Sequence, residues 1–537
     1  MPKRIASIPI GLRRLHAKLP DRVGLGLALL TAVVLILSFP DFDLASLAWV
    51  ALVPLLYAVV YRSPTGLGAL VLGWIAGIVY LIGTCYWLTY AMIHYGGIPT
   101  PVAYFLLVPP AIGVGLLYGG FSWALHRLVV RWGPVAVWAS PLIWIAVECL
   151  RFRIFGQLWN ALGYSQAFYP SVIQSARWGG VYAVSGLIVL VNAAIVYWSG
   201  GRSRNRVGIA LTAGAAVLLL GLLLSGRSVN SPIPSTPVAD VVALQPSVPM
   251  EPVNSLAEMD ELMHRHISLS EQQLSRLPAT NLPRLVIWPE SPMTFMYSRD
   301  TQLREQLADF AIRNRTSLLI NSLEPAAPNG AFNSAMLIDQ NGKLVGQYDK
   351  IYLLPFGEFL PIPTWVPGRD LIPPIVGNFT AGERYPLLPV GPAKAGVVIC
   401  FESAIPSHSA RFATEGADIL LEITNDGYLG PTPVLKQHLT NAIFRAVENQ
   451  RPVVRATNTG ISALVTAHGE VVQPTVGFEI TARTFQIERA NSPPTFYARR
   501  GDILAIGGTI ISLLLLLWAR LSRPAKMAED VDQVEIE

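Results

Sequence analysis

The sequence predicts a multi-pass α-helical membrane domain of about eight spans joined to an extracytoplasmic α/β layer sandwich. Two observations lead to this fold class. Of the 537 residues, 52% are hydrophobic and only 14% are charged, whereas soluble globular proteins carry about 25% charged residues. The apolar residues are also segregated, because long apolar runs fill residues 23–225 and 502–520 while residues 235–490 alternate short apolar runs with polar stretches.

Eight apolar runs reach the length of about 17–25 residues that a membrane span requires. They lie at 23–39, 45–61, 68–93, 101–130, 134–150, 181–199, 207–225 and 502–520. The fourth run contains Pro109 and Pro110, which predict a kink or a partly re-entrant segment. The first run lacks a small-residue cleavage site and is soon followed by a second span, so we interpret it as a span and not as a signal peptide.

Basic residues gather in alternate loops between these runs. They are Lys3, Arg4, Arg13, Arg14, Lys18 and Arg22 before the first run, His126, Arg127 and Arg131 after the fourth, Arg202, Arg204 and Arg206 after the sixth, and Arg520, Arg523 and Lys526 after the eighth. Because Lys and Arg mark the cytoplasmic side, both termini are expected in the cytoplasm and the segment before the last span outside it. Arg151, Arg153 and Arg177 are exceptions to this pattern.

The segment between the seventh and eighth runs has an alternating pattern of strands and helices. Strands are expected at 238–246, 284–291, 316–324, 333–350, 395–403, 417–426, 451–472 and 482–488, and helices at 258–277, 300–315, 406–416 and 435–451. Such alternation favours an α/β layer sandwich, and near-continuous Val/Ile/Leu strands favour sheets covered on both faces. We therefore divide the chain into a membrane domain at 1–234, a catalytic domain at 235–495, and a last helix with its tail at 496–537.

Three motifs in the catalytic domain end or follow predicted strands. WPES carries Glu290, YDKIYLLPFGEFLP carries Lys350 and Glu358, and GVVICFES carries Cys400 and Glu402. Each residue alone has an ordinary interpretation, since a buried free cysteine is commonly just a small hydrophobic residue. Together, a thiol nucleophile, a carboxylate base and an ammonium that stabilises an oxyanion are the parts of an acyl-transfer site.

Composition and spacing exclude several other classes of site. The net charge of +5 is modest, and the basic residues lie near span ends, which argues against nucleic-acid binding. Cys85 and Cys149 lie in apolar runs, so no disulfide framework is indicated, and no Cys/His spacing predicts a metal. His264 and His266 are expected on a solvated helix face, and no histidine stands in a catalytic motif. We expect no metal and no organic cofactor.

The three motifs resemble the nitrilase superfamily, whose sites use Glu, Lys and Cys in that chain order on an αββα sandwich. The WPE, DK and CxE settings of Glu290, Lys350 and Cys400 match residue by residue. ITNDGYLG (423–430) and RAVENQRPVVRATNTGIS (445–462) resemble two further segments of that superfamily. The resemblance implies a Glu290–Lys350–Cys400 triad, with Glu358, Phe401 and Glu402 as auxiliary or substrate-site residues.

The layout of seven spans, a nitrilase-like domain and one last span resembles the membrane-embedded apolipoprotein N-acyltransferase family. GQLWNALGYSQ (156–166) is similar to a loop of that family before the sixth span, and its Trp159, Tyr164 and Gln166 are candidates to line a lipid opening. Many members carry Tyr after the catalytic cysteine, where this chain has Phe401.

This resemblance implies a bacterial inner-membrane enzyme with a periplasmic catalytic domain. It would transfer an acyl chain from a phospholipid, expected to be phosphatidylethanolamine, to the N-terminal amine of a diacylglyceryl-cysteine lipoprotein through a thioester on Cys400. This is the last step of lipoprotein maturation.

Two other functions remain open at this point. A membrane-tethered nitrilase-type amidohydrolase would use the same three residues with water in place of the amine, and release of free fatty acid or ammonia would reveal it. A transporter or receptor would require ionisable residues inside the spans, where we find only Glu148.

Overall fold

The computed structural model describes residues 18–200, 206–227, 235–251, 255–290, 293, 295–328, 330–363, 365–367, 369 and 377–522. Some of the basic residues used above to predict orientation lie outside these ranges. They are Lys3, Arg4, Arg13, Arg14, Arg202, Arg204, Arg523 and Lys526.

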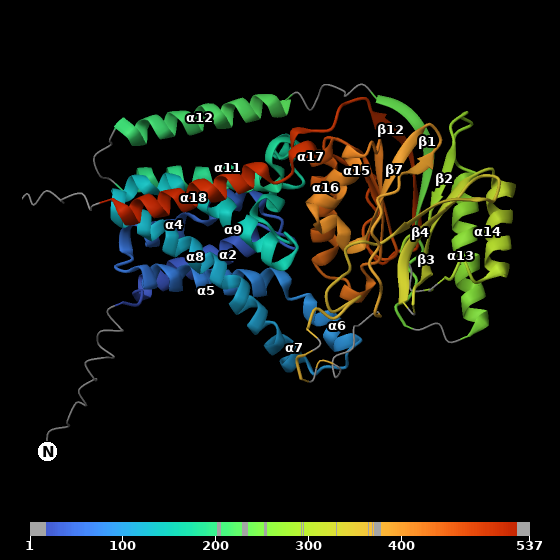
Figure 1. Cartoon of the computed structure of the whole chain (residues 1–537), viewed down its shortest axis with the longest axis horizontal. Helices are drawn as coiled ribbons and strands as arrows, with labels where there is room; N and C mark the ends of the chain where they lie inside the picture. The colour runs from blue at the N-terminus through green and yellow to red at the C-terminus, as the bar shows by residue number, and fades with distance from the viewer. Residues whose placement is uncertain are drawn as a thin grey trace, which may run out of the picture.

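Each apolar run assigned to the membrane is helical in the structure, in places with breaks (Figure 1). The helices are α2 (Arg22–Leu37), α3 (Ala48–Ala51), α4 (Val53–Tyr57), α5 (Gly66–Cys85), α6 (Leu88–His94), α7 (Thr100–Leu106), α8 (Val108–Trp132), α9 (Ser140–Phe155), α10 (Pro170–Ile173), α11 (Ala176–Ser199), α12 (Arg206–Arg227), α17 (Phe496–Arg500) and α18 (Ile503–Leu521). Among the described residues, five helical stretches are long and apolar enough to cross a membrane, namely Ala45–Arg62, Gly66–Cys85, Thr100–Phe155, Ala176–Ser199 and Ile503–Leu521. Thr100–Phe155 contains two of the predicted runs, and two further apolar helices are shorter, so the count of eight crossings stays a prediction.

The helix breaks follow from proline and glycine. The kink predicted at Pro109 and Pro110 is confirmed as a break between α7 and α8, with both prolines in the first turn of α8, where a missing N–H does no harm. The helix α11 is interrupted at Gly179 and Gly180, and Gly180 has φ +62°. A Cβ on Gly180 would lie 2.6 Å from the Tyr497 ring, so only glycine fits here.

The helices α5 and α8 pack closely because small residues face each other. Gly73 and Gly77 lie on α5, and Gly115 and Gly119 lie on α8, in both cases four residues apart. A Cβ on Gly73 would lie 2.3 Å from the Tyr118 carbonyl oxygen. In a lipid environment helices associate largely through such close backbone approach, so this seam holds the centre of the membrane region together.

The sandwich contains two six-stranded sheets. The first has the order β12-β1-β2-β3-β4-β5, formed by β12 (Thr481–Ala490), β1 (Ser235–Gln245), β2 (Arg284–Ile287), β3 (Ser317–Ala326), β4 (Gly330–Ile338) and β5 (Leu344–Asp349). The second has the order β11-β10-β9-β8-β7-β6, formed by β11 (Val471–Val472), β10 (Ala463–Val465), β9 (Val453–Thr457), β8 (Ile419–Thr424), β7 (Ala393–Ile399) and β6 (Leu388–Val390). The neighbours β1–β2–β3 and β7–β8–β9 run parallel and the other pairs antiparallel.

Helices cover both outer faces of the sandwich, which gives the αββα layers (Figure 1). The helices α13 (Leu256–Leu274) and α14 (Thr301–Asn314) lie on the side away from the membrane region, and α15 (Pro406–Thr414) and α16 (Val434–Asn449) lie between the second sheet and the membrane helices. The strands β8 and β9 are buried at every position, as expected for strands covered on both faces.

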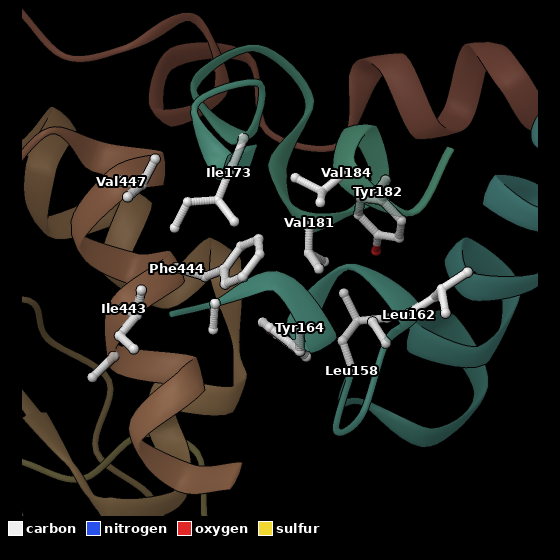
Figure 2. Close-up of a cluster of buried hydrophobic side chains, with 14 of the residues drawn as sticks. Leu158, Leu162, Tyr164, Ile173, Val181, Tyr182, Val184, Ile443, Phe444 and Val447 are labelled. Atoms are coloured by element: carbon white, nitrogen blue, oxygen red, sulfur yellow. The ribbon is translucent and has the colours of Figure 1, made fainter. Parts of the chain in front are cut away.

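The helix α16 joins the two regions of the chain. All of its residues except Leu435 and Lys436 are buried, although it carries several polar side chains, so its polar groups must find partners inside the protein. Figure 2 shows Phe444 of α16 opposite Tyr164 of the membrane region, and the two rings meet edge to face with centroids 4.8 Å apart. The hydrophobic core is continuous from the membrane helices through α16 to the space between the sheets.

Candidate active site

Cys400 is the first residue after β7 and begins the short 3₁₀ helix η7 (Cys400–Ala404). Its backbone has φ +52°, a left-handed conformation that costs a non-glycine residue about 1–2 kcal/mol. The buried strand β7 positions the residue at this point, and Cys400 as a whole is half-buried. A sharp, strained turn at the end of a parallel strand therefore presents the thiol at the edge of the sheet.

Glu290 follows the end of β2, in the other sheet. Its carboxylate accepts hydrogen bonds from Asn333 Nδ2 at 2.8 Å and from the backbone N–H of Asn425 at 3.1 Å. Burial raises the pKa of Glu290, whereas nearby Lys350 and the hydrogen bond from Asn333 oppose that rise. The net direction is upward, which makes this carboxylate a stronger base than an exposed glutamate.

Lys350 directly follows β5, and its side chain is only 1% exposed. Its ammonium nitrogen lies 2.8 Å from Glu358 Oε1 and 3.6 Å from Glu290 Oε1. Burial acts to lower the pKa of Lys350, but the two carboxylates outweigh burial and raise the pKa above its ordinary value. The amine is therefore a fixed cation between two acids.

Glu358 completes this buried group of charges from the Pro/Gly loop that follows Lys350. Its Oε2 accepts from the Leu354 backbone N–H at 2.8 Å, and its Oε1 accepts from Asn333 Nδ2 at 3.0 Å. The side-chain amide of Asn333 thus bridges the two carboxylates. The backbone carbonyl oxygen of Asn333 also accepts a hydrogen bond from the backbone N–H of Lys350 at 2.8 Å.

The pKa of the Cys400 thiol is raised well above its ordinary value. Burial is the main cause and the charge of Glu290 adds to it, whereas Lys350 opposes both. The resting thiol is therefore protonated near neutral pH. Attack by the thiol then requires a nearby base, and Glu290, whose charge affects the pKa of the thiol, is the candidate for that base.

Glu402 is fully buried and serves the backbone around the site. Its Oε1 accepts from the Tyr348 hydroxyl at 2.6 Å and from the Ile351 N–H at 2.7 Å, and its Oε2 accepts from the Ile399 N–H at 2.8 Å. Burial acts to raise the pKa of Glu402, but His408 and these donors lower it overall. One carboxylate thus ties the segment after Lys350 to the strand that ends at Cys400.

The structure also brings in residues that the sequence interpretation did not assign to the site. Asn333 is one of them, and His438 on α16 is the other, with Nε2 3.2 Å from the Cys400 carbonyl oxygen. The expectation that His266 is solvated is wrong, because it is buried against Trp288 with ring centroids 4.9 Å apart. No sequence motif marks Asn333 or His438, since both reach the site only through sheet order and helix packing.

A buried ionic network lies behind the nucleophile. Arg455 on β9 pairs with Glu422 on β8 and, at 3.0 Å, with Asp426. Asp426 also lies 2.6 Å from His438 Nδ1. Arg445 and Glu448 on α16 form a further buried ion pair, at 2.7 Å.

The loop at residues 156–166 docks onto α16. Trp159 Nε1 and Trp87 Nε1 both donate to Gln437 Oε1, each at 2.9 Å. Tyr164 and Gln166 are each only 2% exposed, so the idea that they line a lipid opening is wrong. They belong to the core that joins the sandwich to the membrane helices.

Aromatic residues of the membrane region also approach the loop that follows β8. Tyr95 lies against Tyr428 with ring centroids 5.7 Å apart. Burial raises the pKa of Tyr428 to about 12, and the charges of Glu290, Glu358 and Cys400 contribute to the rise, so Tyr428 lies close to the charged site. Residues from both regions of the chain thus surround the nucleophile.

Among the described residues, no group of three or more His, Cys, Asp and Glu side chains is arranged to hold a metal ion. The site brings together a thiol, two carboxylates and an ammonium. A candidate nucleophile, a carboxylate near it and a fixed cation fit acyl transfer through a covalent intermediate.

Comparison with known proteins defines the class of the sandwich. Residues 246–491 match the carbon-nitrogen hydrolase family, and residues 31–194 match the apolipoprotein N-acyltransferase N-terminal domain. The protein is thus a nitrilase-superfamily domain attached to a helical membrane region. The solved structure of an amidase from Nesterenkonia sp. is similar over 50% of this chain and 96% of the amidase chain, with a TM-score of 0.37 and 19% sequence identity.

Curated relatives extend the similarity to nearly the whole chain. Apolipoprotein N-acyltransferase from Geobacter metallireducens is 29% identical over 498 residues, which cover 89% of this chain and 92% of that protein. The enzyme of the same name from Sinorhizobium medicae is 30% identical over 418 residues, or 75% of this chain and 76% of that protein. The chain belongs to the apolipoprotein N-acyltransferase family, and with its apolar helices it is an inner-membrane enzyme.

Proposed function

We propose that this protein transfers an acyl chain from a phospholipid to the N-terminal α-amine of a diacylglyceryl-cysteine lipoprotein, through a thioester on Cys400. Family membership supports a reaction between a phospholipid and a lipoprotein in the membrane. The observation that carries the mechanism is the placement of one buried carboxylate, Glu290, 3.6 Å from the Lys350 ammonium and close enough to Cys400 for its charge to raise the pKa of the thiol.

In the first half-reaction Glu290 takes the thiol proton and the thiolate attacks the ester carbonyl carbon of the phospholipid. Lys350 and the backbone N–H of Phe401 stabilise the negative oxygen of the tetrahedral intermediate. When that intermediate collapses, the ester C–O bond breaks, Glu290 returns the proton to the leaving oxygen, and a lysophospholipid departs. The acyl chain remains as a thioester on Cys400.

In the second half-reaction the lipoprotein amine attacks the thioester carbonyl. Glu290 accepts the amine proton, the C–S bond breaks, and the thiol is regenerated as the amide product leaves. A covalent intermediate lets one site serve two bulky lipid substrates in turn. We further propose phosphatidylethanolamine as the acyl donor.

We propose that the sandwich faces the periplasm and that both termini are cytoplasmic. Arg131 at the end of α8 donates a hydrogen bond to Ser522, just after α18, at 2.9 Å. This contact supports the proposal that the basic segments after these two helices lie on the same side of the membrane. Arg151, which does not follow the predicted distribution of basic residues, is buried. It donates hydrogen bonds to the Tyr118 hydroxyl at 3.1 Å and to the Trp159 backbone carbonyl at 3.0 Å. Its charge is therefore used inside the fold and says little about orientation.

We keep the division of the chain at 1–234, 235–495 and 496–537 as part of this proposal. The family matches at 31–194 and 246–491 fall within the first two parts. The last part begins at α17, which follows β12 directly and precedes α18.

The test is a reconstitution with phosphatidylethanolamine vesicles and a synthetic diacylglyceryl-cysteine peptide, followed by analysis of both lipid and peptide. We expect lysophosphatidylethanolamine and N-acylated peptide in equal amounts. Free fatty acid without acylated peptide would instead identify a hydrolase. Acylated peptide with another phospholipid, but not with phosphatidylethanolamine, would correct the donor alone.

A further inference from the structure

We propose that His438 is a positioning residue that fixes the peptide between Cys400 and Phe401, so that the Phe401 N–H points at the oxyanion. This inference rests on the proposed function, because the oxyanion forms only when Cys400 attacks an acyl carbonyl. His438 is 3% exposed and lies on α16, behind the nucleophile. It does not touch the reacting atoms and acts through the backbone.

The partners of the imidazole are oxygen atoms. Nδ1 lies 2.6 Å from Asp426 Oδ1, and Nε2 lies 3.2 Å from the Cys400 carbonyl oxygen and 3.5 Å from Glu422 Oε1. Carboxylate and carbonyl oxygens only accept hydrogen bonds. Ser403 Oγ, 3.0 Å from Nε2, donates its own proton to the Cys400 carbonyl at 3.1 Å. The ring is therefore placed so that Nε2 can donate to the Cys400 carbonyl.

The ring lies in a buried ionic network that holds it in place. Arg455 pairs with both Glu422 and Asp426, and Asp426 also lies 2.6 Å from His438 Nδ1. Buried charges are tolerated when they are paired and hydrogen-bonded in this way.

The hydrogen bonds to the Cys400 carbonyl have a direct consequence for Phe401. A trans peptide is planar, and its C=O and N–H point in opposite directions. When His438 and Ser403 hold the Cys400 oxygen on the α16 side, the Phe401 N–H must point away from α16. A hydrogen bond to the carbonyl also polarises the peptide and strengthens its N–H as a donor.

The backbone strain at Cys400 explains why the peptide needs such support. The left-handed φ of +52° is unfavourable for a cysteine, so the backbone at this residue depends on support from its neighbours. A rotation of the Cys400–Phe401 peptide would turn the Phe401 N–H away from the oxyanion. The two hydrogen bonds to one carbonyl oppose it.

The test compares two reactions of the same thiol in the full-length protein. Alkylation by iodoacetamide forms no oxyanion, whereas acylation by p-nitrophenyl butyrate does. Loss of one oxyanion donor slows acyl transfer by about 10²–10³-fold. For His438→Gln we expect acylation of Cys400 to fall by about 10- to 100-fold, since the donor is misdirected and not removed, while alkylation changes by less than about threefold.

The matched control is His266→Gln, which removes another buried histidine of the same domain that lies against Trp288. It should leave the ratio of acylation to alkylation as in the wild type. Equal losses in both reactions of His438→Gln, or no loss in either, would overturn the inference. If that variant does not fold, Ser403→Ala removes the other donor to the same carbonyl and should show the same selective loss.

A parallel incubation with phosphatidylethanolamine separates this inference from the proposed function. Wild-type protein that is acylated by p-nitrophenyl butyrate but not by any phospholipid contradicts the proposed function, and the ratio measured above still decides the role of His438. Wild-type protein that is acylated by neither ester contradicts both.

Discussion

The ammonium nitrogen of Lys350 lies closer to Glu358, at 2.8 Å, than to Glu290, at 3.6 Å. Glu358 is thus the main counterion of the lysine. The carboxylate of Glu290 keeps room for the thiol proton because it is not locked in a short ion pair with the amine. Glu358 therefore holds the lysine in place, and Glu290 is left to accept the proton.

Replacement of Lys350 by Met should slow thioester formation by about 10²–10³-fold, because an oxyanion partner is lost. It also leaves two buried carboxylates without their cation, so the thermal midpoint should fall. Single-turnover acylation and a melting curve measure the two effects. The exposed Lys394→Met, on β7, is the control, and comparable losses in both variants would argue against a specific role for Lys350.

The pH dependence of acylation should report the state of Glu290. The base works as a carboxylate, so the rate is lost as pH falls through its folded pKa. Because that pKa is raised, the acid limb should lie above the ordinary glutamate value of about 4.3. In Glu290→Gln the residual rate should lack this limb. An identical limb in the variant would assign the titration to another group.

Asn333→Ala should move the same acid limb to higher pH. The amide of Asn333 donates to both Glu290 and Glu358, and its hydrogen bond lowers the pKa of Glu290, so its removal favours the protonated acid. At a pH below the wild-type pKa of Glu290, acylation should fall by about tenfold for a rise of about one pKa unit. Asn341→Ala, in an exposed turn, is the matched control. A limb that stays in place would show that Asn333 does not set the acidity of Glu290.

The seam between α5 and α8 should be sensitive to single methyl groups. A Cβ on Gly119 would lie 2.9 Å from the Leu70 carbonyl oxygen, whereas a Cβ on neighbouring Gly120 has nothing within 4 Å. Gly119→Ala should destabilise the protein by about 1–3 kcal/mol, because the added methyl group overpacks the seam. This loss should appear as a lower thermal midpoint in detergent. Gly120→Ala should be neutral or slightly stabilising. Equal effects in the two variants would contradict the close packing of these helices.

Much of the fold could be predicted because its signals are local. Long apolar runs mark the membrane helices, and alternating short runs mark the sandwich. The ends of predicted strands also carried Glu290, Lys350 and Cys400, which the structure brings together at one edge of the two sheets. Whether these three residues act as a triad stays a prediction until the variants are measured.

The remaining parts of the site depend on contacts between distant segments. Asn333 reaches the carboxylates because β4 pairs with β5, and His438 reaches Cys400 because α16 packs behind η7. The burial of polar residues on α16 also depends on contacts with the membrane loop, such as that of Trp159 with Gln437. Periodicity in one segment carries no information on such pairings.

The most direct test of the thioester mechanism is intact-protein mass spectrometry of the detergent-purified enzyme after incubation with phosphatidylethanolamine alone. The mechanism predicts a mass gain of one acyl chain that hydroxylamine removes and that Cys400→Ala lacks. Release of fatty acid with no such adduct, or an adduct that persists in Cys400→Ala, would contradict it.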